Sequence, residues 1–152
     1  MFQCNPSEVF VGESTSNNLY KVIDSLAGTK KFNISLLHCN TDYPTKPKDL
    51  NLLAIKKLKK TFKCQVGLSD HSLGIEASIA AVALGSEIIE KHFTLSREMK
   101  GPDHIASLEP KELGKLVKSI RNIELALGQN KKFATKSEKK NIKIVRKSIV
   151  AK

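Results

Sequence analysis

The fold is decided by Val66-Gly-Leu-Ser-Asp-His71 and Glu87-Ile-Ile-Glu-Lys-His92, two strand-like segments that each end in a histidine. Residues 75–84 between them form a good helix pattern that is closed by Gly85. A helical crossover makes the two strands parallel. If they are neighbours, their carboxyl ends lie about 5 Å apart. His71 and His92 then share one rim and can bind one divalent cation, although two unrelated polar residues would give the same spacing.

The remaining chain repeats the same alternation of strand and helix. We expect further strands at 8–11 and 32–38, helices at 18–27, 52–62 and 110–127, and an extended arm at 142–150. Asn51 is a candidate cap for the helix at 52–62. Four such units predict an α/β fold with parallel strands, and they amount to half of an eight-stranded TIM-type β/α barrel. Functional residues lie at the carboxyl ends of the strands in such a barrel. An open, doubly wound sheet would gather polar residues at the same edge, so periodicity leaves both architectures open.

The charge of the chain is concentrated at its end. The 152 residues, one domain's worth of chain, carry 26 Lys and Arg against 15 Asp and Glu, a net charge of +11. Residues 131–152 contain eight Lys and one Arg against Glu138 alone. Phe133 is the single aromatic residue in this tail, which therefore lacks the interleaved rings of a single-strand binder. We expect a solvated linker or a phosphate-attracting surface, and no nucleic acid as partner.

Cysteine use and hydropathy indicate the compartment. Cys4, Cys39 and Cys64 are odd in number and show no Cys-x-x-Cys spacing, which fits a reducing cytoplasm. No apolar stretch has the length needed to cross a bilayer, and the first residues show no basic region followed by an apolar run. The sequence predicts a cytoplasmic protein without a membrane partner.

Five motifs make the pattern specific. In order they are Leu36-Leu-His-Cys39 with Tyr43-Pro44, Gly67-Leu-Ser-Asp-His-Ser-Leu-Gly74, Glu90-Lys-His-Phe93, Gly101-Pro-Asp-His104 and Ala106-Ser-Leu-Glu109. Together they resemble the sialic acid synthases, the N-acetylneuraminate synthase family with its legionaminic and pseudaminic acid synthases. The resemblance runs from Asn33 to the end of the chain. It implies that residues 1–128 are the C-terminal half of a catalytic barrel and that 129–152 are a basic linker or arm towards an antifreeze-like domain.

The resemblance also implies a reaction. Members of the family condense phosphoenolpyruvate with N-acetylmannosamine or a related acylated amino sugar, giving phosphate and N-acetylneuraminate or a related nonulosonate. They are transferases that form a carbon–carbon bond and need a divalent metal, Mn²⁺ or Mg²⁺. By position in the motifs, the resemblance implies that His71 and His92 are the metal ligands. It implies that Glu90 and Asp103 are catalytic carboxylates at the acceptor sugar. It also implies that the substrate contacts are Tyr43, Ser69 and Thr41.

Several of these residues have simpler interpretations. Ser69 and Asp70 could cap the following helix, and Asp103 could be a turn residue. Glu90 could pair with Lys91 or with a helix lysine at the surface, although its place on the same strand face as His92 disfavours this. A further set is more often structural than functional and stays outside the predicted site: His38, His104 and Cys39.

The departures from the family concern the first half of the barrel. The chain lacks that half, and it has Gly12-Glu-Ser-Thr15 where relatives have a strand ending in a Ser-Thr-Gly-Met turn. We expect a fragment that is weak or inactive alone and that associates with a missing N-terminal half-barrel or a second copy, as a homo-oligomer. The alternatives are a partner-completed metal-binding half-barrel without activity of its own, and another phosphoenolpyruvate-condensing barrel enzyme.

Overall fold

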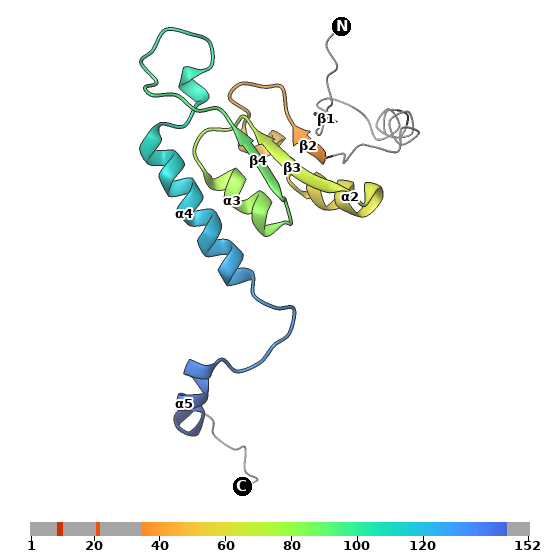
Figure 1. Ribbon diagram of the computed structural model, residues 1–152, viewed down its shortest axis with the longest axis vertical. Helices are drawn as coiled ribbons and strands as arrows, with labels where there is room; N and C mark the ends of the chain where they lie inside the picture. The colour runs from red at the N-terminus through yellow and green to blue at the C-terminus, as the bar shows by residue number, and fades with distance from the viewer. Residues whose placement is uncertain (1–8, 11–20, 22–34, 146–152) are drawn as a thin grey trace, which may run out of the picture.

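A computed structural model describes residues 9–10, 21 and 35–145 of the chain. Four parts of the sequence predictions lie outside these described residues: the segment 12–15, the predicted helix at 18–27 except for Lys21, Cys4, and residues 146–150 of the predicted arm. From Ser35 to Leu127, strands alternate with helices (Figure 1). The expected α/β class with parallel strands is confirmed.

One sheet positions the candidate site. Its four strands lie in sequence order, each parallel to the next: β1 (Val9–Phe10), β2 (Ser35–Cys39), β3 (Gln65–Asp70) and β4 (Ile88–Lys91). The register pairs Cys39 with Ser69, Ser69 with Glu90, and Asp70 with Lys91. Both predicted strands with terminal histidines are present, and each histidine is the first residue after its strand.

A helix follows each of the strands β2, β3 and β4. These helices are α2 (Leu53–Phe62), α3 (Glu76–Ala83) and α4 (Pro110–Leu127), with short 3₁₀ turns at η1 (Pro47–Asp49) and η2 (His104–Ala106). α4 begins with a reciprocal capping box between Glu109 and Glu112, and it ends at Gly128, as predicted. The predicted cap of α2 was wrong. Asn51 has a left-handed φ of 46°, and Leu52 precedes the helix without a side-chain cap.

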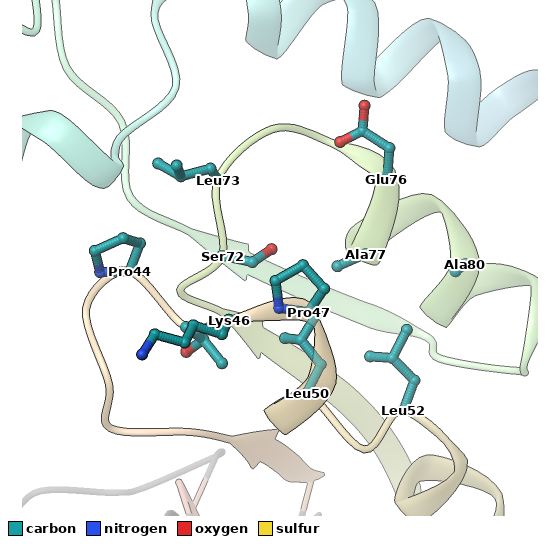
Figure 2. Close-up of a pocket in the computed structure, with 11 residues that line it drawn as sticks. Pro44, Lys46, Pro47, Leu50, Leu52, Ser72, Leu73, Glu76, Ala77 and Ala80 are labelled. Atoms are coloured by element: carbon teal, nitrogen blue, oxygen red, sulfur yellow. The ribbon is translucent and has the colours of Figure 1, made fainter.

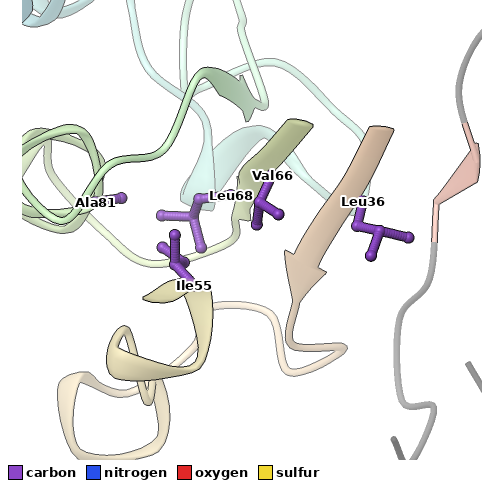
Figure 3. Packing of buried hydrophobic residues seen from close by; sticks show 5 residues of the cluster. All are labelled: Leu36, Ile55, Val66, Leu68 and Ala81. Carbon is purple, nitrogen blue, oxygen red and sulfur yellow. The ribbon is translucent and has the colours of Figure 1, made fainter. Parts of the chain in front are cut away.

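The apolar core lies on one face of the sheet. Figure 3 shows Leu36, Val66 and Leu68 from β2 and β3 packed with Ile55 of α2 and Ala81 of α3. These five side chains have at most 1% of their surface exposed. Successive strand residues point to opposite faces, so the odd-numbered neighbours Leu37, Gly67 and Ser69 lie on the other face. The core and the candidate site therefore use alternate residues of the same strands.

Gly67 lets the central strands approach each other closely. A β-carbon at this position would lie 2.2 Å from Leu37 Cδ2, 2.6 Å from the Ile88 carbonyl oxygen and 2.7 Å from Ile88 Cβ. Side chains normally keep about 3.5–4.0 Å between carbons. Only glycine fits here without movement of β2 or β4.

The end of the described chain differs from the prediction. Residues 136–145 form the helix α5 (Lys136–Val145), so the predicted extended arm is wrong over 142–145. Thr135 and Glu138 explain the helix, because the Glu138 N–H donates to Thr135 Oγ1 at 3.2 Å and the Thr135 N–H donates to Glu138 Oε2 at 2.7 Å. This is a capping box, and the Thr-x-x-Glu signal was present in the sequence. α5 lies beyond α4, away from the sheet (Figure 1).

Candidate functional site

The two predicted metal ligands lie side by side at the carboxyl ends of β3 and β4. The imidazole centroids of His71 and His92 are 5.4 Å apart. Each backbone is held by a segment outside the sheet: Thr45 N–H donates to the His71 carbonyl and Leu108 N–H donates to the His92 carbonyl, both at 2.9 Å. The structure thus brings the two histidines together, as expected from neighbouring parallel strands.

Hydrogen bonds fix the orientation of the His71 ring. His71 Nδ1 lies 2.6 Å from the Asn40 carbonyl oxygen. A carbonyl oxygen only accepts, so Nδ1 carries the hydrogen and Nε2 of the neutral ring presents a lone pair. Two hydroxyl oxygens lie close to Nε2, Tyr43 Oη at 2.9 Å and Ser69 Oγ at 3.2 Å.

The Glu90 carboxylate determines which of the two hydroxyl groups donates a hydrogen bond to His71 Nε2. Ser69 Oγ donates to Glu90 Oε1 at 2.5 Å, which uses the single hydroxyl hydrogen of Ser69. The Tyr43 hydroxyl is therefore the donor to His71 Nε2. Glu90 and Ser69 face each other across β3 and β4 in register, on the same sheet face. The interpretations of Glu90 as a partner of Lys91, and of Ser69 as a helix cap, are both wrong in this structure.

Tyr43 covers the histidine pair. Its ring stacks on His71 with centroids 3.9 Å apart, and it meets His92 edge-on at 5.5 Å. The side of the ring that faces away stays open, because the residue is 46% exposed. Burial of the inner part raises the pKa of the phenol, and so do the negative charges that Cys39, Asp103 and Glu90 would carry. The phenol is held in its neutral, hydrogen-donating form.

Asp103 and Thr41 lie in loops at the same end of the sheet. Asp103 is exposed, directly before η2, and is near enough to raise the pKa of Tyr43. Thr41 is exposed in the loop after β2, two residues before Tyr43. The roles of both residues stay predictions. His38 and His104, which were left outside the site, contact the Leu50 carbonyl and the Thr94 hydroxyl at 2.8 Å each.

An ion pair that was not predicted from the sequence lies beneath the site. Asp70 is 1% exposed, and its Oδ2 lies 3.0 Å from Lys91 Nζ. Burial opposes ionisation of Asp70, but hydrogen bonds from Ser72 and Ser78 and the charge of Lys91 outweigh it and hold its pKa below the usual range. Asp70 therefore does not cap the following helix. The sequence did carry a signal for this ion pair. Asp70 and Lys91 each stand directly before one of the two histidines, so neighbouring parallel strands place the two opposite charges beside each other.

A cavity of about 630 Å³ lies between the loop after β2 and the start of α3 (Figure 2). Its walls are mainly apolar, from Pro47, Leu50, Leu73 and Ala77. Ser72 is the lining residue that immediately follows His71. Neither histidine lines the cavity, so we locate the candidate site at the histidine pair and not in this cavity.

The donor set fits a metal that keeps open coordination positions. Within residues 35–145, no group of three or more His, Cys, Asp and Glu side chains is arranged to hold an ion. Two imidazoles 5.4 Å apart, one with an oriented lone pair, can supply two ligands, and water or substrate oxygens would supply the others. A fixed Nδ1–H···O=C bond is the usual outer support of a metal-binding histidine.

Fold and site together define a class: an α/β protein with parallel strands whose polar cluster lies at the carboxyl ends of those strands. The model of the NeuB family matches residues 6–132. The chain belongs to the NeuB family, which confirms the resemblance to the sialic acid synthases.

Named relatives agree with this assignment. The chain is 58% identical over 125 residues to the N,N'-diacetyllegionaminic acid synthase of Campylobacter jejuni, covering 82% of this chain and 37% of that protein. It is 41% identical over 139 residues to human N-acetylneuraminate-9-phosphate synthase, covering 91% of this chain and 38% of that protein. A structure of N-acetylneuraminic acid synthetase from Leptospira borgpetersenii, in complex with citrate, matches with a TM-score of 0.80 and 40% identity, covering 90% of this chain and 47% of that one. The chain spans less than half the length of each of these proteins.

Among the described residues, none of the helices has both the length and the apolar character that a bilayer crossing requires. Cys39 and Cys64 carry free thiols. The cytoplasmic location stays a prediction.

Proposed function

We propose that this chain supplies the metal-binding half of a nonulosonic acid synthase, which condenses phosphoenolpyruvate with an acylated amino sugar of the N-acetylmannosamine type. One observation carries the proposal: His71, His92, Ser69, Glu90 and Tyr43 form a single hydrogen-bonded and ring-stacked cluster at the ends of adjacent strands. The names of the relatives support the same reaction class.

Each residue of the cluster has a chemical task in this proposal. His71 and His92 would hold Mn²⁺ or Mg²⁺, which supplies Lewis-acid polarisation of the acceptor's aldehyde oxygen. The Glu90 carboxylate accepts hydrogen bonds and would orient hydroxyl groups of the sugar, with Asp103 as a second carboxylate from the loop. Ser69 fixes Glu90 through its bond to Oε1. Tyr43, which is 46% exposed, would present an aromatic face to substrate. Thr41 would offer a hydroxyl group towards phosphoenolpyruvate.

We further propose that the four parallel strands are half of an eight-stranded β/α barrel. The strand order, with each strand parallel to its neighbour, is that of consecutive barrel strands. Residues 1–128 would belong to this half, and 129–152, with α5, to a basic linker or arm. An N-terminal half-barrel or a second copy would complete the sheet. The isolated chain is then weak or inactive as a synthase.

Metal binding tests the first part of the proposal. Titration of the full chain with Mn²⁺ by calorimetry is expected to show one site, which His71→Ala and His92→Ala each remove. His104→Ala is the matched control, because His104 bonds to Thr94 outside the cluster and its loss should leave the site intact. Equal binding by all three variants would contradict the histidine pair as the metal site.

Complementation tests the reaction. The chain is mixed with the N-terminal half of the Campylobacter jejuni relative, and phosphate release from phosphoenolpyruvate and N-acetylmannosamine is measured. Turnover that appears only in the mixture, and disappears with His92→Ala, is the expected result. High turnover by the purified chain alone would contradict the half-barrel. Metal binding without turnover in any mixture would favour the alternative, a metal-binding half-barrel without activity.

A further inference from the structure

A buried polar cluster lies on the opposite sheet face from the histidines. Asp70 Oδ1 accepts the Ser72 N–H at 2.9 Å and the Ser72 hydroxyl at 2.6 Å, while Oδ2 accepts the Ser78 hydroxyl at 2.5 Å and Lys91 Nζ at 3.0 Å. Lys91 Nζ also donates to the Ser72 carbonyl at 2.6 Å. The cluster joins β3, the turn after it, α3 and β4. The side chains of both charged residues are almost fully buried, at 0% and 3% exposure.

The position of this cluster matters more than its contribution to stability. A buried ion pair is often no more stabilising than an apolar pair of the same volume. Asp70 and Lys91 are, however, the last pair of the β3–β4 ladder, and the next residues in that register are His71 and His92. Where the ladder ends, the ion pair continues the link between the strands. Asp70 and Ser72 also hold the backbone immediately before and after His71.

We propose that the Asp70–Lys91 ion pair is a positioning element that sets the separation of His71 and His92 and the orientation of the His71 ring. The two charges act through the backbone and touch no substrate. Ser72 transmits the restraint to the far side of His71, because both its N–H and its carbonyl group are held by the pair. With His71 fixed in this way, its Nδ1 meets the Asn40 carbonyl and its Nε2 is aimed at the shared rim.

The inference rests on the proposed function only for the identity of the group that the histidines bind. The orientation of the ring can be measured without any metal. Imidazole ¹⁵N chemical shifts at about pH 8, above the ordinary histidine pKa of about 6.5, report which nitrogen carries the hydrogen. The parent chain is expected to show His71 as the pure Nδ1–H form.

The decisive variant removes both charges and leaves neither unpaired. Asp70→Asn/Lys91→Met keeps the volumes but breaks the cross-strand link, and Ile55→Val is the matched control that weakens the core away from the histidines. In the double variant we expect a mixture of His71 nitrogen forms and a Mn²⁺ dissociation constant raised about 10- to 100-fold, the usual effect of losing outer support. Ile55→Val should keep the parent spectrum and affinity.

The outcomes separate the two proposals. A folded double variant with the parent spectrum and affinity would overturn the positioning role, and so would an equal loss in Ile55→Val. If the parent chain binds no Mn²⁺, the metal assignment fails, while the ¹⁵N spectra still decide on positioning. If the double variant does not fold, Lys91→Gln removes the cation of the pair while keeping a polar side chain, and a folded Lys91→Gln with the parent spectrum would overturn the proposal.

Discussion

Replacement of Gly67 by alanine is expected to destabilise the sheet at the base of the candidate site. The added methyl carbon would lie 2.2 Å from Leu37 Cδ2, and rotation of that side chain could relieve this contact. It would also lie 2.6 Å from the Ile88 carbonyl oxygen and 2.7 Å from Ile88 Cβ. These two atoms belong to the neighbouring strand and can move only if β4 moves.

The size of the effect follows from this overlap. Insertion of a methyl group into a packed region costs about 1–3 kcal/mol, and occasionally more. Gly114 in α4 is a matched control, because an added β-carbon there meets no atom within 4 Å. Alanine in a helix interior is more stable than glycine by about 0.5–1 kcal/mol. The substitution of glycine by alanine should therefore lower the free energy of unfolding at position 67 and raise it at position 114.

Urea unfolding, followed by far-ultraviolet circular dichroism, measures both effects. With a slope of about 1–3 kcal/mol per molar urea, Gly67→Ala should lower the midpoint by about 1 M and Gly114→Ala should raise it slightly. Metal binding by Gly67→Ala should also weaken, because Ser69 follows on the same strand and His71 directly after its end. A midpoint for Gly67→Ala equal to or above that of the parent would refute the reasoning from close strand packing.

Three further predictions concern single side chains. Tyr43→Phe should tighten Mn²⁺ binding about two- to tenfold in calorimetry, because the metal no longer displaces a hydroxyl bond to the imidazole worth about 0.5–1.5 kcal/mol; weaker binding would contradict this. The hydrogen bond from Arg97 holds the pKa of Glu112 below its usual value, so ionised Glu112 stabilises the fold above about pH 4, and the stability difference between parent and Glu112→Gln should shrink as the pH falls below that. Lys59→Met removes an exposed pair with Glu87 and should change the free energy of unfolding by less than about 1 kcal/mol; a larger loss would contradict a surface role.

Periodicity was sufficient to predict the sheet. Apolar runs with strand character, interrupted by helix patterns of the right length, predicted parallel neighbours, and the two histidines at strand ends followed from that geometry. The position of α4 was equally readable, since Pro110 and Gly128 mark its ends. Local signals of this kind predict the folded structure well because they depend on residues that lie close together in the chain.

Contacts that depend on distant backbone atoms were not readable. The Asn40 carbonyl that orients His71 has no signature in the side-chain sequence, because every residue carries such a group. The Asp70–Lys91 pair was only partly readable, for a different reason. Each residue alone is typical of a strand end or a surface, and only the register of β3 against β4 buries them together. At Asn51, the backbone conformation overrode an otherwise good capping residue.

The alternation of faces along β3 and β4 makes the two strands intolerant of insertion or deletion. Removal of one residue from β4 upstream of Glu90 would turn Lys91 towards the histidine rim and His92 towards the helices, since side chains change face at every step. The buried carboxylate of Asp70 would lose its counter-ion in the same event. We therefore expect insertions and deletions in this family in the loops after β2 and β4. The lengths of the strands β3 and β4 should stay constant among active relatives.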